Sequence, residues 1–359
     1  RVALPTARPA IAVGIILALM EALNDIGAVE FLGIRTLTFS IFDIWLNRSS
    51  LAGAAQLSLF LMVLVIGLMM IERSFRRHQI YHDSKQGRVI NELIPLQGLK
   101  AALASGLCLL PLLLGFLVPV AQMVHFTIKR PEQFSEPALY LAMSNTISVA
   151  FGAAIICVLA GFAVVFASRS SGRRLYKTAR HIAGLGYAVP GTILAIGILT
   201  ALTGFDNWVS AIVKAQFGFK TGLLLSGSIA IVIYACSVRF LTIAIGNIEA
   251  GYAKVSPNIM AAARTLGHSE GSALRRVEFP LISKALLVAG VLVMVETTKE
   301  LSATILLRPF NFDTLSTYVY SRASRAVFED ASLAALLIVL ISLIPVYVLT
   351  RIIISEQKR

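Results

Sequence analysis

The sequence carries few charged residues, only 14% of its 359 positions, whereas soluble domains carry about 25%. Hydrophobic residues make up 57% of the chain, and the mean hydropathy is +0.80. The three cysteines, Cys108, Cys157 and Cys236, lie in apolar runs without a CxxC partner, so neither a disulfide framework nor a zinc site is indicated. Because one soluble core could not bury this much apolar sequence, an ordinary soluble domain is excluded.

Signatures of nucleotide binding and hydrolysis are also missing. The dipeptide Gly-Lys occurs nowhere, so there is no Walker A pattern, and HExxH is absent. One G-x-S-x-G match, at 267–271, lies in a loop between predicted spans rather than at the strand-to-helix turn that this catalytic motif requires. The net charge is +13, but the basic residues fall in the loops between apolar runs rather than on a recognition element. We therefore expect no catalytic site, no cofactor bound by this chain and no nucleic-acid partner.

Long apolar segments are what the sequence has in abundance. Eight of them are long enough to span a bilayer, which takes about 20 residues, and they must be helices because lipid cannot satisfy backbone polar groups. The predicted spans are 9–31, 51–71, 101–125, 138–167, 181–202, 221–243, 284–307 and 332–350. The fold class expected is therefore an all-α, polytopic membrane bundle with the lipid bilayer as a partner.

The loop charges orient these spans. With the N-terminal end of the sequence in the cytoplasm, the inside stretches carry 21 Lys and Arg and the outside stretches carry 9. Cytoplasmic loops carry the excess of Lys and Arg in membrane proteins. An even number of spans also puts the C-terminal end inside. We predict that both ends of this sequence are cytoplasmic and that the protein lies in a bacterial inner membrane.

The start of the chain repeats near its end at an offset of 275 residues. The pairs Pro5/Pro280 and Glu21/Glu296 match at this offset, and apolar periodicity alone would not align a proline and an intramembrane carboxylate. Parallel internal repeats are typical of transporters. We predict that 1–71 is the end of a first repeat, 72–100 a cytoplasmic linker and 101–359 a complete second repeat, so that the sequence looks truncated at its N-terminal side.

The stretch 261–280 reads AAARTLGHSEGSALRRVEFP. It resembles the cytoplasmic "EAA" loop of ABC-importer permeases, in which EAA is followed by three residues, Gly, nine residues and Ile-x-Leu-Pro. The matching positions are Ala262, Ala263, Gly267, Val277, Phe279 and Pro280, whereas Ala261 replaces the leading Glu; Val2, Leu4 and Pro5 match the end of a second such loop. A helix of small residues can pack closely into a groove, and glycine permits the sharp turn.

This resemblance implies the type I ABC-importer permease fold and a set of partners. Two separate ATPase subunits, which bind ATP and Mg, would dock on the two loops, and a periplasmic substrate-binding protein would deliver the cargo. The stretches 187–199 and 299–320 further resemble the ferric-iron importers of this type, so we expect ferric iron as the cargo. Permeases for thiamine, phosphonates, polyamines and sulfate are related alternatives within the class.

Four carboxylates are candidates for the cargo path. Glu21 and Asp25, like Glu296 and Glu300, are spaced i, i+4 in equivalent segments, which places each pair on one helix face. Ionisable residues in a bilayer are functional candidates, and hard cations prefer oxygen ligands. Local neutralisation of Glu296 by Lys299 is the simpler alternative, and the identity of any metal-binding residue stays open.

Two other classes compete with an importer subunit. An ion-coupled secondary transporter would favour inverted repeats and broken helices at the midplane, whereas the repeat here is parallel. A membrane-embedded enzyme would need a catalytic set that the sequence does not contain. Alternating access driven by a separate ATPase is the mechanism expected.

Overall fold

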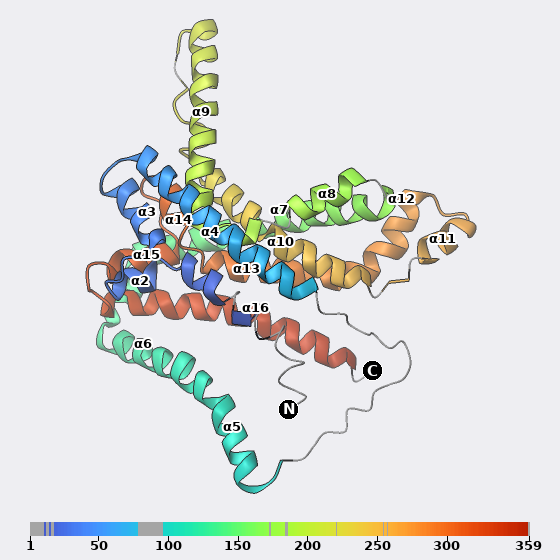
Figure 1. The fold of residues 1–359 in the computed structure, drawn as a ribbon, viewed down its shortest axis with the longest axis horizontal. Coiled ribbons are helices and arrows are strands. Elements are labelled where there is room, and N and C mark those ends of the chain that lie inside the picture. The colour runs from blue at the N-terminus through green and yellow to red at the C-terminus, as the bar shows by residue number, and fades with distance from the viewer. Residues whose placement is uncertain are drawn as a thin grey trace.

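The computed structural model describes residues 11, 14–15, 18–77, 96–171, 174–183, 186–219, 221–253, 255–256 and 258–357. Within these ranges every regular element is helical (Figure 1). In chain order the elements are α2 (Gly27–Phe31), α3 (Leu37–Leu46), α4 (Leu51–Arg77), α5 (Gly98–Leu112), α6 (Val118–Lys129), α7 (Pro137–Ser171), α8 (Arg174–Ala183), α9 (Gly191–Phe217), α10 (Ile229–Ala253), α11 (Asn258–Thr265), α12 (Glu270–Ala273), α13 (Phe279–Thr298), α14 (Thr304–Leu307), α15 (Leu315–Ala323) and α16 (Ser332–Gln357).

Short 3-10 and π-helical turns connect several of these helices. The π turns Leu113–Leu117 and Leu274–Glu278 make α5 continuous with α6 and α12 continuous with α13, and 3-10 turns lie at Pro131–Ser135, Gly186–Ala188 and Glu329–Ala331. The predicted all-α membrane class is confirmed.

Seven helices in the described residues are long and apolar enough to cross a membrane. They are Leu51–Ile71, Gly98–Lys129, Pro137–Arg169, Gly191–Phe217, Ile229–Ala253, Gly271–Thr298 and Glu329–Arg351. The eighth predicted span, 9–31, lies partly outside the described residues. Its described part is helical at 18–24, is interrupted at Asp25 and Ile26, and resumes as α2.

Two neighbouring predicted spans are wrong in their register. The helix expected over 221–243 begins only at Ile229 and continues to Ala253, and the span before it is displaced in the same direction. We expected a helix over 181–202 and an outside loop over 203–220, but the long helix begins at Gly191 and continues to Phe217. Pro190 takes the N-cap position in an extended conformation, and the left-handed Gly218 (φ 77°) ends the helix. Asp206 does not interrupt the helix because it is buried and accepts hydrogen bonds from Leu225 N and from Ser226 N and Oγ.

The core forms where α7, α10 and α13 pack against one another. Small residues let these helices approach closely, as is usual between membrane helices. A Cβ on Gly161 of α7 would lie 3.3 Å from the Ala244 Cβ of α10, and one on Gly152 would lie 3.1 Å from Ile233 Cδ1. In contrast, the side chains of α5 are almost all exposed, and Figure 1 shows α5 pointing away from the bundle. Helix α6, which continues it, packs against α16. The exposed apolar surface of α5 suits a helix that faces lipid.

The two repeat copies share a sequence of elements. A helix ends near Asn24 in one copy and at Thr298 in the other, and a break and a short helix follow, α2 or α14. Next comes a helix with a threonine N-cap, Thr36 for α3 and Thr314 for α15, and then the long helix α4 or α16. The predicted linker 72–100 falls largely outside the described residues, at 78–95.

Candidate functional site

The helix breaks in the two copies are built in the same way. The Asp25 carboxylate accepts a hydrogen bond from the Ala28 backbone N–H at 3.0 Å, and the Glu300 carboxylate accepts one from Ala303 N at 2.9 Å. Asp25 and Glu300 are equivalent at the 275-residue offset, as are Ala28 and Ala303. Carboxylates satisfy the free N–H groups at a helix start, so each copy stabilises its break with the same local contact.

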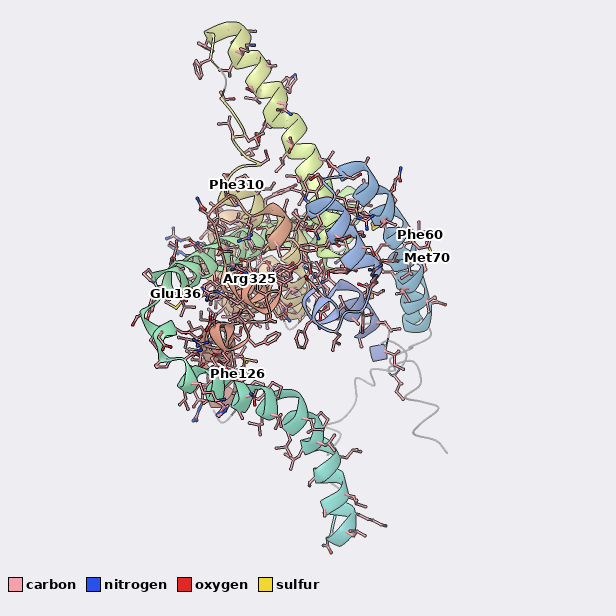
Figure 2. All side chains as sticks on the ribbon, turned by 90° about the vertical axis from the view of Figure 1, so that its left-hand side faces the viewer. Phe60, Met70, Phe126, Glu136, Phe310 and Arg325 are labelled. Atoms are coloured by element: carbon pink, nitrogen blue, oxygen red, sulfur yellow. The ribbon has the colours of Figure 1, made fainter. Side chains whose placement is uncertain are left out.

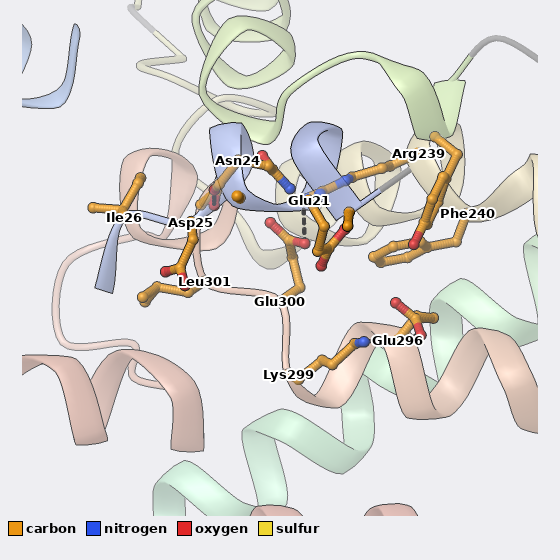
Figure 3. Close-up of a pocket in the computed structure, with 14 residues that line it drawn as sticks. Glu21, Asn24, Asp25, Ile26, Arg239, Phe240, Glu296, Lys299, Glu300 and Leu301 are labelled. Carbon is orange, nitrogen blue, oxygen red and sulfur yellow. Dashed lines mark hydrogen bonds and ion pairs between the residues drawn. The ribbon is translucent and has the colours of Figure 1, made fainter. Parts of the chain in front are cut away.

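A cavity of about 480 Å³ lies where the two copies meet. Figure 3 shows Glu21, Asn24 and Asp25 of the first copy on one side and Glu296, Lys299 and Glu300 of the second copy opposite them. The remaining lining residues are Ala18, Ala22, Ile26, Tyr187, Arg239, Phe240, Leu301 and Ser302. The structure therefore brings all four predicted carboxylates to one cavity, although they come from segments about 275 residues apart in the chain.

Charges in the cavity are partly neutralised. Arg239 of α10 forms an ion pair with Glu300, and both side chains are at least 94% buried. Lys299 Nζ lies 3.0 Å from Glu296 Oε1, as the alternative based on local neutralisation predicted. Four carboxylates against two basic groups leave an excess of negative charge at the cavity wall.

Metal binding by a preformed cluster has no support in the described ranges. Nowhere in them do three or more His, Cys, Asp or Glu side chains gather closely enough to hold a metal ion. With one oxygen of Glu300 held by Arg239 and the other by Ala303 N, this carboxylate acts as a structural link between α10 and the helix break. Glu21 and Glu296 line the same cavity beside it.

Asn24 joins the two copies next to the cavity. Its side-chain oxygen accepts a hydrogen bond from Gly191 N at 2.9 Å, and its backbone carbonyl accepts one from Ser302 Oγ at 2.9 Å. A Cβ on Gly191 would lie 2.7 Å from Arg239 Nη1 and 2.9 Å from Ser302 Cβ, so only glycine fits here. The Pro190–Gly191 step therefore positions the start of α9 against both copies.

Sequence reasoning missed three of these residues. Arg239 could have been found, because it is the only basic residue in the predicted span 221–243 and an intramembrane charge needs a partner. Asn24 and Gly191 had no such signal, since their roles depend on a contact between segments far apart in the sequence.

The second predicted site, the loop 261–280, forms two helices joined by a turn. Ala261, Ala262 and Ala263 lie in α11, and Gly267 has φ +88°, the left-handed conformation expected of a glycine turn. Ala263 is buried, whereas Ala262 is exposed beside Leu266, whose side chain is 81% exposed. This face of α11 presents small and apolar side chains to a partner.

The end of the loop leads directly into the membrane. Val277 is half-buried in the π turn, Phe279 begins α13 and is partly exposed, and Pro280 occupies the first turn of that helix. Proline suits a first turn because its missing N–H needs no partner there. Val2, Leu4 and Pro5 of the second predicted loop lie outside the described residues.

Comparison with known families fits this arrangement. Residues 158–358, which include the loop, α13 and the second-copy side of the cavity, match the model of the family described as "Binding-protein-dependent transport system inner membrane component". The chain belongs to this family. It is a multi-pass inner-membrane protein of that class.

The curated relatives are named for the transport of different cargoes. The Fe(3+)-transport system permease protein of Haemophilus influenzae is 27% identical over 353 residues, which is 97% of this chain and 66% of that protein. A proposed 2-aminoethylphosphonate transport system permease protein of Salmonella paratyphi A is 26% identical over 228 residues, or 63% of this chain and 80% of that protein. The chain thus spans just under two thirds of the length of the first of these permeases.

A solved structure supports the fold. The crystal structure of a bacterial ABC transporter involved in the import of the acidic polysaccharide alginate contains a chain with a TM-score of 0.53 and 17% sequence identity. The likeness covers 70% of this chain and 96% of that one. The fold is therefore that of an ABC-importer permease, as the loop motif had predicted.

Proposed function

We propose that this chain is the membrane-spanning subunit of an ATP-driven importer that works by alternating access. The observation that carries the proposal is helix α13, which begins at the end of the loop 261–280 and ends beside the cavity. Its 20 residues span about 30 Å at 1.5 Å per residue. A push on the loop would move one rigid helix and change the cavity at its other end.

The partners follow from the loop. Two ATPase subunits, which bind ATP and Mg, would dock on 261–280 and on the repeat loop that ends at Pro5. The exposed Leu266 and Ala262 suit an apolar groove on such a subunit. A periplasmic binding protein would deliver the cargo at the outer face, and both ends of the sequence would lie in the cytoplasm.

We propose ferric iron as the cargo. The excess of carboxylates at the cavity attracts a cation and disfavours the anionic group of a phosphonate or sulfate. The relative from Haemophilus influenzae is named for Fe(3+) transport, and its match covers nearly the whole chain. Thiamine and polyamines are cationic and are the alternatives that the charge of the cavity leaves in place.

The direct test is uptake of radiolabelled ferric iron by cells that lack the full-length gene, with and without complementation. Complementable loss of binding-protein-dependent uptake would establish both the cargo and its direction. Unchanged ferric uptake in the deletion strain would remove iron, and labelled thiamine and then a polyamine would be tested in the same strains. A Glu21→Gln, Glu296→Gln double variant should lose uptake while it inserts normally.

A further inference from the structure

Three of the four carboxylates that line the 480 Å³ cavity already hold a group of the protein itself. Their partners are Arg239 for Glu300, Lys299 for Glu296 and the Ala28 backbone N–H for Asp25. Within the described part of the chain, Glu21 is the lining carboxylate that has neither an ion pair nor a hydrogen bond. The cavity therefore offers a metal ion little more than one unengaged carboxylate.

One carboxylate supplies too few ligands for a bare ferric ion. Hard cations take several oxygen ligands at once, whereas in the described ranges no three His, Cys, Asp or Glu side chains gather to hold a metal ion. The cost of moving an ion from water into a medium of low dielectric constant also rises with the square of its charge, and it is already large for a single charge. A ferric ion that keeps anionic oxygen ligands enters with a lower net charge and with its coordination shell filled.

The size and the mixed charge of the cavity suit such a complex. Its volume of about 480 Å³ falls within the range of about 300–1,000 Å³ that is usual for pockets that bind small organic molecules. Lys299 lines it with a side chain that is 51% exposed, and Arg239 lines it with an Nε that has no hydrogen-bond partner in the described residues. Figure 3 shows Glu21 across the cavity from Lys299, so the two walls differ in charge.

We propose that ferric iron crosses this cavity as a complex with a small oxyanion, a hydroxycarboxylate or a phosphate, rather than as a bare ion. Lys299 and Arg239 donate hydrogen bonds to the oxyanion, and Glu21 faces the positively charged metal. The inference names the form of the cargo and rests on the proposed importer function. It also explains why the protein spends most carboxylates of the cavity on its own contacts, since the ion brings its ligands with it.

The test follows iron and oxyanion together. The full-length permease is reconstituted in liposomes with its ATPase subunits, and the binding protein is loaded with radiolabelled iron in the presence of labelled citrate or, in a second arm, labelled phosphate. In one of these arms the oxyanion should enter in a fixed ratio to iron when ATP is present, and it should not enter without iron. Iron uptake without either label would overturn the inference and leave the ferric importer standing. A wild-type protein that imports no iron with ATP would instead refute ferric iron as the cargo, and the inference with it.

A charge variant separates the two forms of the cargo. Lys299→Ala should lower the initial rate of iron uptake at saturating binding protein by about tenfold, the loss expected of one charge-assisted hydrogen bond, whereas Lys299→Arg should stay within about twofold of wild type. Lys214→Ala should be neutral, because Lys214 lies in the last turn of α9, the helix that projects from the bundle in Figure 2. For a bare ferric ion, removal of a positive charge would leave uptake unchanged or raise it, and that result for Lys299→Ala would overturn the inference.

Discussion

The ion pair between Arg239 and Glu300 gives the sharpest prediction. Both side chains are almost completely buried, and Glu300 has its second oxygen on Ala303 N. Removing one partner of a buried pair leaves an uncompensated charge and costs about 3–5 kcal/mol. We therefore expect Arg239→Met, which retains most of the side-chain volume, to lower the free energy of unfolding by about 3–5 kcal/mol.

The double variant should be more stable than this single variant. Glutamine at position 300 carries no charge and can still accept from Ala303 N through its amide oxygen. Adding Glu300→Gln to Arg239→Met therefore replaces a buried charge by a satisfied polar group, and the total loss should fall to about 1–2 kcal/mol. Such recovery is the non-additive behaviour of residues in direct contact.

The assay is reversible unfolding in mixed micelles, followed by circular dichroism for wild type, both single variants and the double variant. Leu287→Ala serves as the control, because its half-exposed side chain on α13 takes no part in the pair. The reasoning is refuted if Arg239→Met unfolds within about 1 kcal/mol of wild type, or if the two single losses simply add in the double variant.

Three further predictions concern Gly191 in α9, Leu266 in the loop 261–280 and Tyr318 in α15. Gly191→Ala should destabilise the protein by about 1–3 kcal/mol because of the contacts below 3 Å that its Cβ would make, measured by the same micelle unfolding. Leu266→Glu should leave the fold intact but reduce co-purification of the ATPase subunit by at least about tenfold, since it places a charge in an apolar contact. Burial and the hydrogen bond to Glu136 raise the pKa of Tyr318. The protonated Tyr318 therefore contributes stability that is complete below about pH 10 and is lost as the pH rises through the raised pKa of the folded state. In Tyr318→Phe, the free energy of unfolding should fall less steeply with rising pH in an alkaline titration.

Each of the three has a contrary outcome. Gly197→Ala on the same helix, where a Cβ meets nothing within 4 Å, should be neutral, and equal losses at Gly191 and Gly197 would contradict the packing argument. If the ATPase subunit co-purified with Leu266→Glu as well as with the wild type, the exposed surface around Ala262 and Leu266 would not be the docking surface. If the free energy of unfolding of Tyr318→Phe fell with alkaline pH as steeply as that of the wild type, the pKa of Tyr318 would not differ between the folded and unfolded states.

The sequence predicted the membrane class, most spans and the glycine turn of the loop well. Span boundaries went wrong where polar residues inside a helix are satisfied locally, as Asp206 is by Leu225 and Ser226. The four carboxylates were chosen for their spacing and repeat symmetry, and they do meet at one cavity. Their separate roles could not be read from spacing, because Asp25 and Glu300 make contacts that Glu21 and Glu296 do not.

Hydrophobic run length is a local property, so the sequence alone determined that this chain is a helical membrane protein. The internal repeat is also readable from the sequence, and it predicts that the chain is built from related copies. The turn in the loop 261–280 was also readable, since it depends on a single glycine, Gly267, and the adjoining helices depend on short-range spacing. The tertiary structure decided that Arg239 pairs with Glu300 and that Asn24 holds Gly191 and Ser302. These contacts join segments tens to hundreds of residues apart, and only the packing of helices in space brings them together.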